Sequence, residues 1–196
     1  MNRLILTSFA WIVLSVLFAA SGYAQCTIAV DEVDPFDSTR TVASEAINIG
    51  DYIASDYIQD NGEYKMIEQA KIFFTFSQLD SFDVNFLVIG TPERSRPKIF
   101  DGVNVFLLLS SGEVVGLNNY PDKGEFDKKI NLRVYRHHCL LPKDLYYTLT
   151  NETISIIRIQ YEGKRKDIPL NKSQQEKVRE AIRCVGKQIG RWPVRP

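Results

Sequence analysis

The stretch KIFFTFSQLDSFDVNFLVIG, residues 71–90, decides the fold. It holds two runs in which every second side chain is apolar: Ile72, Phe74 and Phe76, then Phe82, Val84, Phe86 and Val88. A period of two places each run on one face of a β-strand, and the intervening residues 77–81 suit a hairpin loop. Together they predict an antiparallel hairpin with one buried face.

The same alternation recurs through the rest of the chain. It runs over residues 103–109, and the Ser110-Ser111-Gly112 turn leads into a partner at 114–115. It returns at 130–134, and again at 157–161 before a turn into residues 167–168. Repeated hairpins of this kind predict a mainly β fold, either an antiparallel β-sandwich or a strongly curved sheet.

Two helices are expected in the C-terminal third of the chain. Pro142 and Asn151 frame a short one, with Pro142 at the first helical position. A longer one begins at Ser173-Gln174-Gln175-Glu176, which has capping-box spacing, and Gly190 can end it. Its apolar stripe consists of Val178, Ile182, Val185 and Ile189. This stripe predicts a C-terminal amphipathic helix packed on the sheet.

Residues 47–65 show no clean period. Asp51-Tyr52-Ile53 recurs as Asp56-Tyr57-Ile58, and Asp60-Asn61-Gly62 marks a turn. We interpret this stretch as an irregular connection within one domain.

The N-terminus has the pattern of a cleavable export signal. Arg3 precedes an uncharged apolar run from Leu4 to Ala20, and small residues Gly22 and Ala24 suit signal peptidase. We therefore expect a signal peptide over residues 1–24, one β-rich domain over 25–190, a tail over 191–196, and a periplasmic or secreted product. An uncleaved anchor is the alternative. No second apolar run is long enough to predict a membrane span in the mature chain.

Charge argues against two classes of partner. Loss of Arg3 leaves 23 of the 24 basic residues against 24 acidic ones. Such a chain has no basic excess to attract nucleic acid and no polybasic stripe for anionic lipid.

Three cysteines remain after cleavage: Cys26, Cys139 and Cys184. Because exported chains meet an oxidising compartment, pairing is the default expectation. We favour a Cys139–Cys184 disulfide. Pairing of Cys26 with either one, or three reduced buried thiols, are the alternatives.

Several segments carry a resemblance. Residues 31–37 (DEVDPFD) open the mature domain, VFLLLSSGE at 105–113 forms a hairpin, and ISIIRI at 154–159 precedes a terminal helix containing Cys184. In this order the chain resembles a loose group of uncharacterised exported proteins of Bacteroidota-type bacteria. The resemblance implies an exported bacterial protein and supplies no active site.

Two groups of side chains are candidate metal ligands. Asp31, Asp34 and Asp37 crowd a short loop, and carboxylate oxygens are what Ca²⁺ requires. The segment lacks the EF-hand glycine and terminal glutamate, so we favour a solvated hairpin turn and predict no metal site. His137 and His138 are the chain's two histidines. Adjacent strand residues point to opposite faces, so we expect a solvent-facing pair and no shared zinc ion.

No catalytic or cofactor motif stands out. A Cys139 nucleophile with His138 as its base is conceivable, but sequence neighbours seldom have that geometry. The sequence thus leans against an enzyme and predicts no cofactor. We expect a non-catalytic binding or structural module of the cell envelope, for an unknown protein or small ligand. Aromatic side chains available for recognition are Tyr52, Tyr57, Tyr120, Tyr146 and Tyr147. A periplasmic hydrolase with a carboxylate-based site and a small-ligand carrier inside a barrel are the alternatives.

Overall fold

The computed structural model describes residues 27–79 and 82–191. The predicted signal peptide, Cys26, the hairpin residues 80–81 and residues 192–196 of the predicted tail lie outside this part. The strands are β1 (Ile28–Val33), β2 (Arg40–Ser44), β3 (Ile47–Ile58), β4 (Tyr64–Leu79), β5 (Phe82–Glu93), β6 (Gly102–Leu109), β7 (Val114–Pro121), β8 (Glu125–Asp127), β9 (Leu132–Leu140), β10 (Ile154–Tyr161) and β11 (Lys164–Pro169). The helices are α2 (Lys143–Asn151) and α3 (Lys172–Gln188).

Within the described residues, eleven strands form one antiparallel sheet that is not closed. Its order is β1-β2-β4-β5-β9-β7-β6-β10-β11, with β3 added to β4 and β8 added to β9. The prediction of a mainly β fold is confirmed, and the sheet is the curved one of the two alternatives. The 71–90 stretch forms the predicted β4–β5 hairpin, with a register from Lys71↔Gly90 to Leu79↔Phe82. The face predicted for the second strand is wrong. Leu87 and Ile89 face the core, whereas the run from Phe82 to Val88 that alternates with them lies on the opposite face, where Phe82 is exposed.

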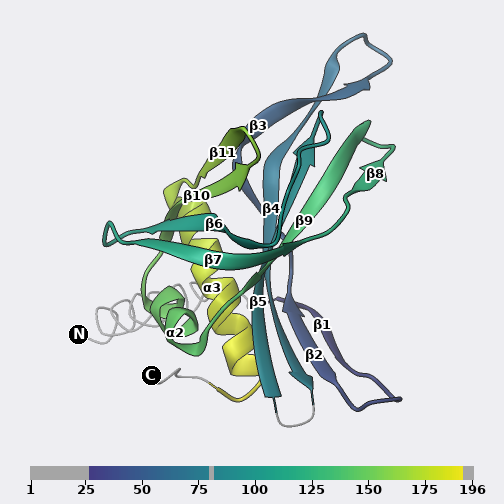
Figure 1. The fold of residues 1–196 in the computed structure, drawn as a ribbon. Coiled ribbons are helices and arrows are strands. Elements are labelled where there is room, and N and C mark those ends of the chain that lie inside the picture. The colour runs from purple at the N-terminus through teal and green to yellow at the C-terminus, as the bar shows by residue number, and fades with distance from the viewer. Residues whose placement is uncertain (1–26, 80–81, 192–196) are drawn as a thin grey trace, which may run out of the picture.

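The sheet bends where β7 meets β9. This junction consists of three residue pairs, Asn119↔Cys139, Tyr120↔His138 and Pro121↔His137. Figure 1 shows β6 and β7 running across the direction of β4, β5 and β9. The bend lets apolar faces from both parts of the sheet enclose one core, which includes Ile72 and Phe74 from one part and Leu107 and Ile157 from the other.

Helix α3 covers this core beside β2, β3, β4 and β10 (Figure 1). Its predicted stripe is confirmed: Val178, Ile182 and Val185 are buried, and Ile189 packs against the core as the C-cap residue. The predicted cap is wrong by two residues. Asn171 is the N-cap, and its side chain accepts from the Gln174 amide while Gln174 accepts from the Asn171 amide. Pro142 likewise precedes α2 as its N-cap.

The interpretation of residues 47–65 as an irregular connection is wrong. They form most of a long β3–β4 hairpin whose turn lies at residues 59–63. The register of β3 against β4 shifts between Ile49 and Tyr52 and again between Ala54 and Ile58. Each β-bulge adds residues to β3, and this hides the two-residue period from the sequence.

The end strand β11 lies beside β3, the strand that is added to β4 in the other part of the sheet. The Gln69 side chain connects them: its Nε2 donates to the Asp167 carbonyl (3.0 Å), and its Oε1 accepts from the Asp51 amide (3.2 Å). Gln174 Nε2 donates to the Gly50 carbonyl (2.9 Å) from α3. We call this contact the seam. No helix in the described ranges is long and apolar enough to cross a membrane.

Candidate functional site

The acidic opening is a hairpin turn between β1 and β2. Asp31 forms an ion pair with Arg40 (3.0 Å), and this hydrogen bond, with one from Gln188, lowers the pKa of Asp31. Asp34 accepts from the Phe36 amide, and Asp37 accepts from the Thr39 amide. These carboxylates therefore hold the turn and do not converge on one point. No group of metal-ligating side chains converges anywhere among the described residues.

The predicted Cys139–Cys184 disulfide is absent. Cys139 is a free thiol buried on β9, and burial raises its pKa to about 12. It lies two residues from His137 on the core face, whereas His138 points to the opposite face. The pairing of Cys139 with His138 as nucleophile and base is thus excluded by geometry, and the thiol stays protonated at neutral pH.

The two histidines point to opposite faces, as predicted, but they are not a solvent-facing pair. His137 is 0% exposed because β9 carries it into the space between the two parts of the sheet. Burial is the main cause that lowers its pKa to about 4.

His137 belongs to a group of buried polar residues, joined at one end by two lysines that reach the surface, that we call the corner cluster. Six strands contribute to it, and its members are Thr91, Glu93, Asn104, Asn119, His137, Tyr161, Lys164 and Lys166. At one end Glu93 accepts from Lys166 (2.9 Å), Lys164 (3.2 Å) and Tyr161 (3.0 Å). Burial acts to raise the pKa of Glu93, but Lys166 and Lys164 outweigh it and the net direction is downward. Glu93 is therefore a paired anion and not a proton donor.

The tyrosines proposed for recognition separate into two classes. Tyr146 is buried and stacks on Phe74, with ring centroids 5.3 Å apart. Tyr52, Tyr57 and Tyr120 are exposed. Tyr52 and Tyr57 lie on the outer half of the β3–β4 hairpin, which projects past the neighbouring strands (Figure 1). We call residues 51–68 the arm.

The arm carries an uncovered apolar face. Along β4 the even-numbered residues from Phe76 to Ala70 face the core and are buried. The same face continues outward through the half-buried Glu68 to Met66 and Tyr64, which no described residue covers. The opposed β3 residues Tyr52 and Ile58 are exposed as well. With Tyr57, these five side chains retain 42–69% of their surface exposed.

The arm is also acidic. Asp51, Asp56, Asp60, Glu63 and Glu68 stand against one base, Lys65, so five acids and one base give a net charge of −4. Arg94 pairs with Asp56 at 3.0 Å, near the end of β3. Sequence reasoning identified Tyr52 and Tyr57 but missed the face that Tyr52 shares with Ile58, Tyr64 and Met66, because the β3 bulges obscure it.

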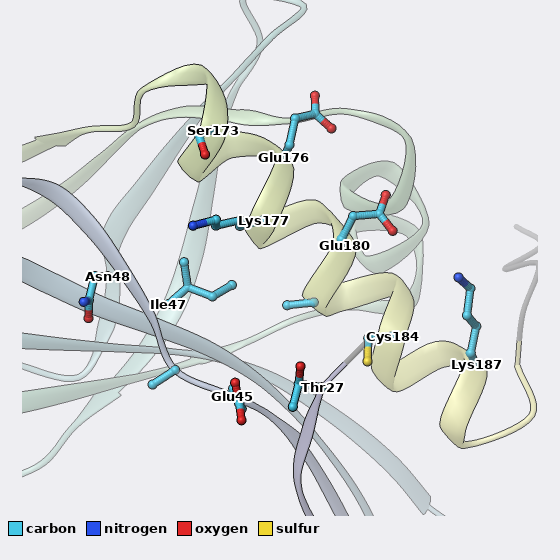
Figure 2. A pocket seen from close by; sticks show the side chains of 12 residues that line it. Thr27, Glu45, Ile47, Asn48, Ser173, Glu176, Lys177, Glu180, Cys184 and Lys187 are labelled. Atoms are coloured by element: carbon cyan, nitrogen blue, oxygen red, sulfur yellow. The ribbon is translucent and has the colours of Figure 1, made fainter. Parts of the chain in front are cut away.

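A concave region lies between α3 and the turn that joins β2 to β3. It encloses about 600 Å³ and its wall includes Thr27, Ile47, Lys177 and Cys184. Figure 2 shows Lys177 and Ile47 directed into the space between helix and strand, whereas Glu176 and Glu180 point away from the strands. Cys184 lies on the side of α3 that faces Thr27 (Figure 2). We call this region the helix groove.

These features must be interpreted from the chain itself, because no protein-family model matches it and no curated protein or solved structure is significantly similar to it.

Proposed function

We propose that this chain is an exported, non-catalytic binding module of the cell envelope, and that the uncovered face of the arm is its contact surface. One observation carries the proposal. The side chains on one face of β4 are buried in the core at Phe74 and Ile72, but those of Met66 and Tyr64 are exposed to solvent. An apolar face gathered on a projecting element marks a site of interaction, and tyrosine and methionine are enriched at protein interfaces.

Charge defines the partner. An arm of net charge −4 is repelled by an anionic lipid surface and attracts a cationic one. The partner that fits is therefore a protein segment in which basic side chains alternate with apolar ones. Its apolar side chains would cover Tyr64 and Met66, and its basic side chains would lie near the acids along the arm's margins.

The proposal is tested with a fluorescent peptide of alternating lysine and leucine, titrated with the mature protein. We expect binding that weakens as salt is added and that falls at least tenfold for the Tyr64→Ser, Met66→Ser double variant. An alternating glutamate–leucine peptide should not bind. Val114→Ser is the matched control, because Val114 is equally exposed but lies on β7. Equal binding by the arm variant would refute the arm as the contact surface.

Export is the second part of the proposal and rests on the leader pattern of residues 1–24. An accompanying disulfide between Cys26 and Cys184 is supported by the helix groove, where Thr27 and Cys184 line the same wall and Cys26 is the residue before Thr27. Formation of the bond transfers two electrons and two protons to an oxidising disulfide of the envelope.

Mass spectrometry of the secreted product tests both statements. Intact mass should correspond to residues 25–196 less two hydrogens, and digestion without reductant should yield a Cys26–Cys184 linked peptide. Retention of Met1 would refute export by cleavage. A full complement of thiols in protein recovered from the envelope would refute the disulfide while leaving the arm proposal intact.

The alternative functions receive less support. A carboxylate-based hydrolase needs two acids in one site, but Glu93 is the single buried acid among the described residues and its partners are lysines. A carrier needs strands that close around a cavity, whereas this sheet is open.

A further inference from the structure

The corner cluster lies at the narrowest part of the sheet. The β7–β9 junction has three residue pairs, and two of its residues, Asn119 and His137, are cluster members with no exposed surface. By contrast, β5 pairs with β9 from Phe86↔Leu140 to Glu93↔Arg133. The connection between the two parts of the sheet therefore depends heavily on side chains at this corner.

A chain of hydrogen bonds runs from Asn119 through His137 to Glu93, and each group in it donates to the next. The Asn119 amide donates through Nδ2 to Nδ1 of His137 (3.0 Å), so the imidazole proton is assigned to Nε2. Nε2 then donates to the Thr91 hydroxyl (3.4 Å), which donates to the Tyr161 hydroxyl (3.4 Å). Tyr161 donates to the Glu93 carboxylate (3.0 Å). The chain is complete only when His137 is neutral.

Asn119 cannot easily turn to accommodate a second imidazole proton. Its Nδ2 also donates to Oδ1 of Asn104 (2.7 Å), and Asn104 in turn donates to the Phe100 carbonyl. Rotating the Asn119 amide would place its oxygen against the Asn104 oxygen. A proton on Nδ1 of His137 would thus point at the donating Asn119 amide, or the amide would have to turn and lose its hydrogen bond to Asn104.

We infer that this corner is an acid-sensitive joint, in which protonation of His137 breaks its bond with Asn119 and loosens β7 from β9. The two parts of the sheet then separate locally while the β4–β5 ladder stays intact. A chain exported from the cytoplasm would meet the pH of its surroundings, so the joint would respond to external acid.

The charged groups around the imidazole oppose one another. Asp122, which follows β7, and Glu93 on β5 favour the protonated form, whereas Lys166 on β11 and His138 on β9 disfavour it. Burial outweighs all of them and brings the pKa of His137 to about 4. Relative to its ordinary value of 6.5, this is roughly a 300-fold weaker affinity for the proton.

Two further neighbours, Tyr161 and Cys139, stay neutral over this range. Tyr161 on β10 lies with its ring centroid 6.1 Å from that of His137, and burial raises its pKa. Cys139 on β9 also has a raised pKa. Lys164 on β11 is paired with Glu93 (3.2 Å). We therefore attribute the loosening of β7 from β9 to the protonation of His137.

Nuclear magnetic resonance of the two histidine side chains, combined with hydrogen exchange, tests the inference on the mature protein. We expect His137 to titrate near pH 4, and amides of residues 119–120 and 137–139 to exchange more than tenfold faster at pH 4.5 than at pH 6.5 after correction for intrinsic rates. Amides of the β4–β5 ladder should show no such rise.

Two variants separate a switch from a merely structural role. His137→Gln should abolish the pH dependence of exchange at the junction, while His138→Gln should retain it. Uniform acceleration across the whole sheet, or an unchanged junction in a protein whose His137 has been protonated, would overturn the inference. Because the wild-type titration answers the question alone, a His137→Gln variant that fails to fold does not leave it untested.

Discussion

Replacement of Gln69 by leucine tests how much the seam between β3 and β11 contributes to stability. Leucine fills a similar volume but lacks the carboxamide, so the hydrogen bonds to Asp51 and Asp167 are lost. Each such bond has a net worth of about 0.5–1.5 kcal/mol, so two give about 1–3 kcal/mol. Water can reach both backbone groups at these strand edges, and we therefore expect a loss of about 1–2 kcal/mol.

Urea unfolding followed by circular dichroism at pH 7 measures this loss. Gln160→Leu is the matched control, since Gln160 is exposed on β10 and forms no side-chain hydrogen bond within the described ranges. The control should change the free energy of unfolding by less than about 0.5 kcal/mol. If both leucine variants unfolded at the wild-type midpoint, the seam would contribute nothing and the reasoning would be wrong.

A coupled substitution sharpens the test. Gly50 has φ of +77°, and an added Cβ would collide with Gln69 Oε1 and lie 2.9 Å from Ile168 Cγ2. Gly50→Ala should cost about 1–2 kcal/mol for the left-handed backbone alone, plus the displacement of Gln69. In a Gln69→Ala background the contact with Gln69 Oε1 disappears, while those with the Cβ of residue 69 and with Ile168 Cγ2 remain. The free energies of unfolding lost in the single variants Gly50→Ala and Gln69→Ala should therefore sum to more than the loss in the double variant.

Three further changes have defined outcomes. Glu93→Gln should destabilise the protein by about 2 kcal/mol at pH 7, less than for a fully buried pair because the Lys164 side chain is 42% exposed. The pKa of Glu93 is lowered in the folded state, so the carboxylate contributes fully to the free energy of unfolding above the ordinary carboxyl pKa. This contribution is lost as the pH falls through the pKa of the folded state. Urea midpoints measured between pH 7 and pH 3 should show this loss in the wild type and less of it in the variant. Asn171→Ala removes the α3 cap and should cost about 1 kcal/mol, measured by the same assay. Leu107→Ala, at a fully buried site, should cost about 2–5 kcal/mol, and a loss below 1 kcal/mol would contradict its place in the core.

Prediction from sequence succeeded where one periodicity governs a whole element. The alternation at residues 72–76 specifies β4, since Ile72, Phe74 and Phe76 all face the core. The stripe from Val178 to Val185 specifies α3 for the same reason. The alternation at 82–88 specifies the strand β5 but not its core face, because Leu87 and Ile89 face the core instead. The capping residue was misplaced because both Asn171 and Ser173 satisfy the spacing rule, and the Gln174 bond to Gly50 that fixes the start is tertiary.

The candidate sites were harder to predict because they combine distant segments. Glu93 lies 71 and 73 residues before the two lysines that pair with it, and nothing local signals that relation. His137 is buried because β7 and β10 close over it, which no pattern within β9 reveals. The arm was missed for a different reason: its bulges interrupt the period on β3, although β4 keeps it down to Tyr64.

A map of the bound peptide tests the central claim, that the arm is a contact surface. Amide hydrogen exchange of the mature protein, with and without the lysine–leucine peptide, locates the covered residues. The account predicts added protection concentrated on residues 52–58 and 64–68. Protection that falls on β6 and β7 instead, or a peptide that binds without protecting the arm, would contradict it.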